Sequence, residues 1–194
     1  MQANSEDRRS EGGSVSIPRS PQPGQVIVSV LTAQQEMLDV VRPLLVEEMG
    51  PIAAEFGPMS FRFTSYYDLE LGPGIRRWIW SFRDLVDRAE LAAIKCLTND
   101  IEQAHLERGL RKFNLDPGVL TLPNFVLATG KERAHRIYLG RGIFADLTLI
   151  FREGTYRPLD WTYPDYADAE MTELLNRLRE TYKCQLKEKG LLRP

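Results

Sequence analysis

The chain has little of the residue types that build metal sites and disulfide frameworks. Its 194 residues include only two cysteines and two histidines. Cys96 and Cys184 lie far apart in sequence and form neither a CxxC redox pair nor a metal knuckle. We therefore expect no metal site, and we expect both thiols to stay reduced, as in the cytoplasm.

Long apolar runs and an excess of basic charge are also missing. No apolar run approaches the ~20 residues needed to cross a bilayer, and the first residues lack the basic and apolar regions of an export signal. We expect a cytoplasmic protein that does not meet a membrane. The formal net charge is -2, so the chain has no basic excess to release counterions from a nucleic acid. No nucleic-acid partner is expected.

The common nucleotide-binding and hydrolase motifs do not occur. Gly130-Lys131 is followed by Glu132, and Phe125 stands where a P-loop has its first glycine. The chain also has no GxSxG elbow and no GxGxxG turn. No motif therefore identifies a cofactor or a reaction.

What is present is the composition of a globular protein, with 43% hydrophobic and 27% charged residues, in a length that suits one domain. Residues 1–24 are rich in serine, glycine, proline and mixed charge, which predicts a disordered tail. Residues 25–190 are expected to form a single α+β domain. We predict a mostly antiparallel sheet with helices packed on it and a C-terminal helix clamping one face.

Hydrophobic periodicity and end signals place the elements. The predicted strands, the first of them central in the sheet, are residues 26–31, 61–64 and 77–82. Two predicted helices begin at capping boxes, Thr32 with Gln35 and Asp87 with Glu90, and end at Gly50 and Gly109. Two more helices are predicted at residues 124–129 and 169–189. A polar stripe on the helix after Asp87 reads as a solvated edge, and its members are Lys95, Asn99 and Glu102.

A β-hairpin is predicted after residue 135, with a three-residue loop at 140–142. The expected pairs are Ile137 with Ala145, Leu139 with Ile143, and Arg136 with Asp146. Tyr138 shares the polar face with Arg136 in this register. His135 is expected on the apolar side, partly buried.

Polar and aromatic residues are densest between residues 111 and 166, and each group has two interpretations. Arg136 with Asp146 could orient a phosphate or a carboxylate, or it could be an ordinary cross-strand ion pair. His135 could be a general acid or base oriented by Asp116 or Asp165, or a structural histidine.

Three further groups in this stretch are equally open. The triplet at residues 116–118, Asp-Pro-Gly, has the composition of a turn. Lys131 could complement a helix dipole or reach an anion. Residues 161–166, which include Tyr163, could stack on a ring or anchor the last helix on the sheet.

Five motifs in this order resemble a known family. They are Phe63-Thr-Ser-Tyr-Tyr67, Lys95-Cys-Leu-Thr-Asn99, Asn114-Leu-Asp-Pro-Gly118, His135-Arg-Ile-Tyr-Leu139 and Trp161-Thr-Tyr-Pro-Asp165. Together they are similar to a prokaryotic domain family of unknown function, number 4416, over about residues 25–186. The resemblance implies no activity, cofactor or site residues, and the P-loop that the "GTP-binding protein" label of some members would require is missing here.

Two hypotheses about function follow. The first is a protein that binds, or acts on, a small anionic metabolite such as a nucleotide in a polar cleft. Its predicted site has His135 and Asp116 as catalytic residues and the following ligand-binding residues: Lys131, Arg136, Tyr138, Asp146 and Tyr163. The second is a non-enzymatic protein–protein interaction module. The first requires these side chains to converge, while the ligand and the oligomeric state are not encoded in any motif.

Overall fold

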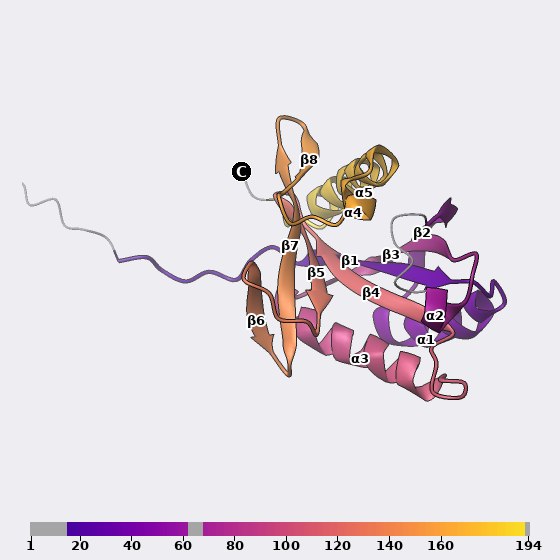
Figure 1. Cartoon of the computed structure of the whole chain (residues 1–194). Coiled ribbons are helices and arrows are strands. Elements are labelled where there is room, and N and C mark those ends of the chain that lie inside the picture. The colour runs from indigo at the N-terminus through magenta and orange to yellow at the C-terminus, as the bar shows by residue number, and fades with distance from the viewer. Residues whose placement is uncertain (1–14, 62–67, 193–194) are drawn as a thin grey trace, which may run out of the picture.

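The computed structural model describes residues 15–61 and 68–192, which form an antiparallel sheet with helices on both faces (Figure 1). The eight strands have the order β2-β3-β1-β4-β5-β7-β6, and β8 pairs with β7. The strands are β1 (Gly24–Thr32), β2 (Ile52–Ser60), β3 (Arg76–Val86), β4 (Phe113–Leu120), β5 (Asn124–Thr129), β6 (Arg136–Gly140), β7 (Ile143–Arg152) and β8 (Thr155–Pro158). The longer helices are α1 (Met37–Met49), α3 (Leu91–Ala104) and α5 (Ala169–Glu188), and the short ones are α2 (Asp68–Leu71), η1 (Arg88–Glu90) and α4 (Pro164–Ala167). The predicted α+β class is confirmed.

β1 lies between β3 and β4, and every residue of it is buried. Because side chains alternate along a strand, Val26, Val28 and Val30 face the core that contains Leu45 of α1, while Ile27 faces the core under α5. The predicted central strand is confirmed. Helices α1 and α3 cover one face of the sheet, and α4 and α5 cover the other (Figure 1).

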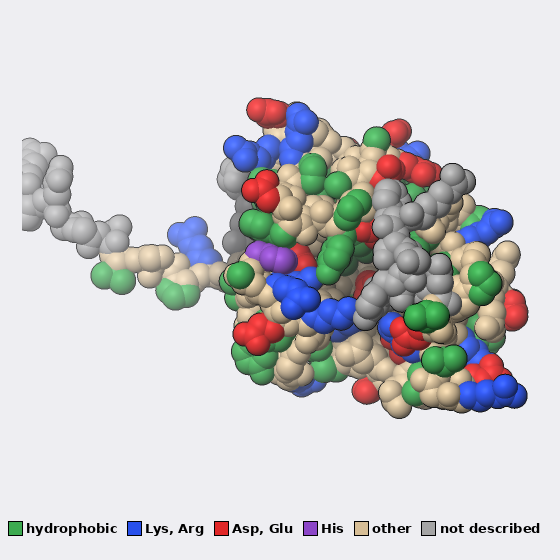
Figure 2. Space-filling model, viewed as in Figure 1, with side chains coloured by type: hydrophobic (Ala, Val, Ile, Leu, Met, Phe, Trp, Pro, Cys, Tyr) green, Lys and Arg blue, Asp and Glu red, His purple; other side chains and the backbone are tan. Residues whose placement is uncertain are grey.

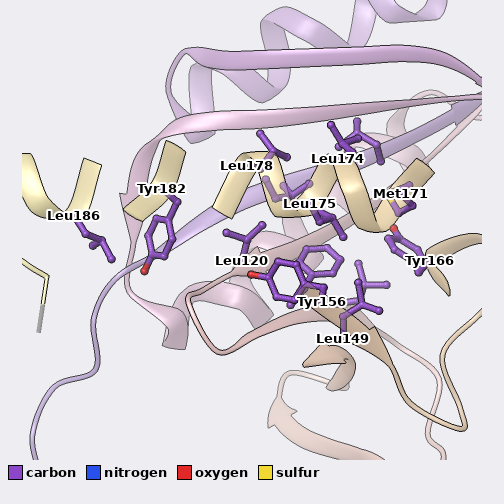
Figure 3. Close-up of a cluster of buried hydrophobic side chains, with 14 residues drawn as sticks. Leu120, Leu149, Tyr156, Tyr166, Met171, Leu174, Leu175, Leu178, Tyr182 and Leu186 are labelled. Carbon is purple, nitrogen blue, oxygen red and sulfur yellow. The ribbon is translucent and has the colours of Figure 1, made fainter. Parts of the chain in front are cut away.

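α5 clamps the second face, as predicted. Its start is capped by the Asp168 carboxylate, which accepts a hydrogen bond from the Glu170 amide. Its apolar stripe points toward Leu120, Leu149 and Tyr156 in the sheet (Figure 3). The buried side chains of this stripe are Met171, Leu174, Leu175, Leu178, Tyr182 and Leu186. No helix in the described ranges is both long and apolar enough to span a bilayer.

Three predicted helix signals are wrong, and one of them is the helix end at Gly109, because α3 ends at Ala104. Thr32 is the last residue of β1, and its hydroxyl donates to the Lys112 carbonyl at 2.8 Å instead of capping a helix. α1 starts later, at Met37. Residues 124–129 form the strand β5, because β4 and β7 on either side take up its backbone groups.

The first part of the sheet also differs from the prediction. Residues 52–60, where no strand is predicted, form β2 at the edge of the sheet. Most of the strand predicted at 61–64 lies outside the described residues. The strand predicted at 77–82 is β3, with Trp78, Trp80 and Phe82 buried together in one core.

The hairpin of β6 and β7 has the predicted register at its base but not at its tip. Arg136 lies opposite Asp146, as predicted, but Gly140 lies opposite Ile143 and a bulge absorbs Leu139. The loop is therefore two residues, 141–142, both with positive φ (56° and 74°). Positive φ at both central positions is typical of the type I′ turn that suits a twisted hairpin.

Candidate ligand-binding cleft

The cleft begins where β4 separates from β5. β4 pairs with β1 along its whole length, but it pairs with β5 only through residues 118–120. Pro117, the next residue toward the open end, has no backbone N–H to offer a neighbouring strand. A Cβ on Gly118 would lie 2.8 Å from both the Phe125 ring and the Val126 carbonyl oxygen. The Pro-Gly pair therefore marks the boundary between the open and the closed half of β4, and the predicted turn at 116–118 is wrong.

Two side chains of α3 satisfy the backbone at the open edge of β4. The Leu115 amide donates to Glu102 Oε1 at 2.6 Å, and Lys95 Nζ donates to the Leu115 carbonyl at 2.8 Å. Both side chains are buried. The predicted solvated edge is therefore wrong for Lys95 and Glu102, whereas Asn99 is exposed as expected.

A cavity of about 600 Å³ lies at this opening. It is bounded by residues from β1, β3, α3, β4, β5, β6, β7 and α4, so segments distant in sequence converge on it. The space-filling view shows basic and acidic side chains gathered around a hollow on this face (Figure 2). The charged lining residues are five cations and three acids: Arg77, Lys95, Arg111, Lys131, Arg136, Asp116, Asp146 and Asp165.

Asp116, on β4, presents a carboxylate to the cavity. Its Oδ1 lies 3.2 Å from Lys95 Nζ, and its Oδ2 accepts a hydrogen bond from Asn114 Nδ2 at 2.6 Å. The side chain remains 31% exposed. Burial opposes ionisation of Asp116, but Lys95 and the hydrogen bond from Asn114 outweigh it and lower the pKa of the carboxyl. The cavity therefore contains a fixed, ionised acceptor.

Arg111 ties this wall to the neighbouring elements. Its Nε and Nη2 donate to the two carboxylate oxygens of Glu70 at 2.6 Å each, and its Nη1 donates to Glu102 Oε2 at 2.8 Å and to Asn114 Oδ1. The hydrogen bond from Arg111 lowers the pKa of Glu70. Burial raises the pKa of Glu102, although Lys95 and Arg111 oppose the shift.

Arg136 organises the opposite wall. Its Nε donates to Asp146 Oδ2 at 2.9 Å, its Nη1 to the Lys131 carbonyl at 2.7 Å, and its Nη2 to the Tyr163 hydroxyl at 3.0 Å. The predicted pair of Arg136 and Asp146 is thus a buried ion pair. All three guanidinium nitrogens are engaged, so this arginine fixes the positions of Lys131 and Tyr163.

His135 and Tyr138 do not reach the cavity lining. The His135 ring stacks on Trp161 with centroids 5.1 Å apart, and its Nε2 lies 3.6 Å from Asp146 Oδ2. His135 therefore shares the partner Asp146 with Arg136, so the prediction that it lies on the apolar face with Ile137 is wrong. The prediction that it is partly buried is confirmed. Tyr138 is exposed and packs on Phe144.

A third arginine, Arg77 of β3, closes the end of the cavity near α4. It pairs with Asp165, and its guanidinium lies 4.8 Å from the ring centre of Phe61 and 5.0 Å from that of Tyr166. Burial raises the pKa of the Tyr166 hydroxyl, so this residue is neutral in the pH range of a cell.

Five of the seven predicted site residues line the cavity: Asp116, Lys131, Arg136, Asp146 and Tyr163. Sequence reasoning missed Arg77 and Arg111 and placed Lys95 on a solvated edge. The sequence does contain a signal for Arg77. Side chains alternate along a strand, so Arg77 points to the face opposite the two buried tryptophans, and a single charge on a buried face suggests a functional role. Arg111 had no such signal, since its partners come from three separate elements.

The fold and the cleft define an α+β protein whose antiparallel sheet opens between two neighbouring strands into a charged cavity. The chain belongs to the family described as Domain of unknown function (DUF4416), which it matches over residues 22–182. No curated protein and no solved structure matches the chain. The family assignment confirms the resemblance seen in the sequence. All four motifs that lie within the described residues contribute to the cavity lining.

Proposed function

We propose that the cleft binds a small anionic metabolite such as a nucleotide. The observation that carries this proposal is the convergence of five cationic side chains on one cavity in a chain whose formal net charge is -2. A cationic cleft in an acidic protein concentrates anions locally. The volume, about 600 Å³, falls within the roughly 300–1,000 Å³ that is typical of small-molecule sites.

The cations differ in how far they are open to a ligand. The side chains of Arg77 and Arg136 are 5% and 3% exposed, whereas that of Arg111 is 22% exposed. Lys131 is exposed and its backbone is held by Arg136. All three guanidinium nitrogens of Arg111 are engaged, as they are in Arg136, so we assign contact with the anion to Lys131 and a positioning role to the two arginines.

The rest of the lining suits the uncharged part of such a ligand. Phe61, Leu127, Tyr163 and Tyr166 contribute apolar and aromatic surface. Tyr163 is half exposed, and its ring is oriented through the hydrogen bond from Arg136 to its hydroxyl. A base or another flat group can stack on such a ring. The two free cysteines support a reducing, cytoplasmic setting for this binding protein.

Calorimetry and thermal shift with a panel of nucleotides and phosphorylated metabolites test the proposal. We expect at least one compound to bind, and we expect Lys131→Ala to weaken it about five- to tenfold, as removal of one charged contact does. Lys183→Ala, at an exposed position of α5, is the matched control and should leave binding unchanged. A panel without any binding contradicts the proposal.

A second candidate function, protein interaction, is supported by the edge strand β6. Its Ile137, Tyr138 and Leu139 are exposed, and edge strands accept extended partner segments. Antiparallel pairing of β6 with a second copy, centred on Ile137, would place Arg133 opposite Arg141, and the like charges would repel. An acidic extended segment of another protein would instead be attracted to both arginines, so we favour such a partner.

Fluorescence titration with a labelled peptide of alternating valine and glutamate tests this candidate. We expect binding that Ile137→Arg abolishes and that Lys183→Ala leaves intact. Equal binding by both variants, or none by the native chain, contradicts a docking role for β6.

A further inference from the structure

We infer that the ligand of the cleft carries hydroxyl groups beside its anionic group, as a sugar phosphate or the ribose phosphate of a nucleotide does. This inference rests on the proposed function and names the class of substrate. It comes from the Asp116 carboxylate, which faces a cavity otherwise dominated by positive charge.

Asp116 is an acceptor held ready for a donor. An ionised carboxylate only accepts hydrogen bonds and has about four lone-pair sites. Lys95 uses one site on Oδ1 and Asn114 uses one on Oδ2, and the side chain is still 31% exposed to the cavity. The Asp116 carboxylate therefore has lone pairs left for a ligand, and Lys95 and Asn114 hold it in position.

Neighbouring acids do not offer the same opportunity. The side chain of Asp146 is 5% exposed and that of Asp165 is 11% exposed, and each is paired with a buried arginine. Asp116 is therefore the acid that a ligand meets. A bare phosphate near it gains nothing from the carboxylate and is repelled by it, whereas a hydroxyl donates a charge-assisted hydrogen bond.

The size of the cavity agrees with this inference. A volume of about 600 Å³ is roughly twenty times the ~30 Å³ that a water molecule occupies in the liquid, so an isolated phosphate would fill only a small part of it. The cations Arg111 and Lys131 and the acceptor Asp116 all line this one space. A ligand that reaches both kinds of group has a charged end and a polar, hydroxylated body.

Calorimetry with three phosphates tests the inference on the full chain. The probes are pyrophosphate, n-pentyl phosphate and ribose 5-phosphate. The last two have the same number of carbon atoms, but n-pentyl phosphate has no hydroxyl group on its carbon chain. We expect ribose 5-phosphate to bind about tenfold more tightly than n-pentyl phosphate, which is the gain from one charge-assisted hydrogen bond. In Asp116→Asn this ratio should shrink to about threefold or less, without loss of n-pentyl phosphate binding.

Asp100→Asn is the matched control, because Asp100 lies on the exposed side of the same helix that carries Lys95. It should keep the native ratio. If both phosphates bind the native chain equally, the inference is wrong while the proposed function stands. If none of the three phosphates binds, the inference is wrong, and the nucleotide panel decides the proposed function separately. If Asp116→Asn does not fold, the comparison of the two phosphates on the native chain still decides.

Discussion

The two halves of β4, residues 113–117 and 118–120, satisfy their backbone N–H and C=O groups in different ways. Residues 118–120 lie between β1 and β5, so strands satisfy their backbone groups on both sides. The preceding residues pair with β1 alone, and at Leu115 the side chains of Lys95 and Glu102 take the place of the missing strand. The difference shows how side chains can satisfy the N–H and C=O of a strand residue where a sheet opens.

The difference in backbone pairing leads to a difference in stability and function. In the closed half, Leu120 packs into the core under α5, where burial of apolar area stabilises the fold. In the open half, buried ion pairs fix the geometry of the cavity, and such pairs contribute little net stability because desolvation offsets their attraction. The closed half should therefore dominate stability, and the open half should dominate recognition.

The largest loss of stability is expected from truncating a side chain in the core that packs against the closed half of β4. Leu175 of α5 is fully buried in the core that also holds Leu120. Leu175→Ala should lower the free energy of unfolding by about 3–4 kcal/mol, measured by urea denaturation. Lys183→Ala on the exposed side of α5 should change it by no more than about 0.5 kcal/mol. A loss of that small size for Leu175→Ala would show that the closed half does not carry the stability.

A smaller effect is expected at the open edge. Glu102→Leu removes the acceptor of the Leu115 amide and one partner of Arg111, so we expect a loss of about 2–3 kcal/mol. Glu102→Gln keeps a side-chain oxygen for the amide and should lose about 1 kcal/mol. Faster hydrogen exchange at Leu115 in the leucine variant alone would locate the effect at the edge. Equal losses in both variants would contradict the role given to this acceptor.

The boundary between the two halves can be probed at Gly118. A Cβ there would press on the Phe125 ring and on the backbone oxygen of Val126. Overpacking should cost roughly 2 kcal/mol, partly offset by the lower entropy of the unfolded alanine chain, so Gly118→Ala should lose about 1 kcal/mol by urea denaturation. Gly130→Ala, where a Cβ meets open space, is the control and should be near neutral. An unchanged stability in Gly118→Ala would mean that β5 can move aside freely.

The strands and helices with strong periodicity could be predicted from the sequence. β1, β3, α3 and α5 each carry an apolar pattern of sufficient length, and Asp87 and Asp168 cap helices as their residue types suggest. The sequence predicts a helix at β5 because the proline before it and the glycine after it resemble helix ends. Its pairing with β4 and β7 is a long-range property that no local pattern contains.

Much of the cavity lining could also be predicted, but not the roles within it. The density of polar residues after position 111 located Asp116, Arg136 and Asp146. The sequence could not show that Asp116 lies in a strand, because Asp-Pro-Gly has turn composition and only the open edge of β4 makes Pro117 acceptable there. Nor could it show that His135 stacks on Trp161 outside the lining.

The smallest expected effect is a pH dependence in which two acids of the open half act in opposite directions. Lys95 and Asn114 lower the pKa of Asp116 below its ordinary value of 3.8 despite burial, so its contribution to stability is present above pH 3.8 and is lost as the pH falls further. Burial raises the pKa of Glu102 above 4.5, so its contribution is present below pH 4.5 and is lost as the pH rises through the raised value.

Thermal unfolding of the native chain, Asp116→Asn and Glu102→Gln between pH 3 and pH 8 separates the two contributions. Relative to the native chain, Asp116→Asn should be most destabilised at neutral pH and should recover as the pH falls below 3.8. Glu102→Gln should be most destabilised near pH 4 and should recover as the pH rises. Asp100→Asn, an exposed acid on α3, should follow the native profile. If the destabilisation of both variants changed with pH in the same direction, the two acids would not have pKa values shifted in opposite directions. Lys95 would then not hold Asp116 in its ionised form.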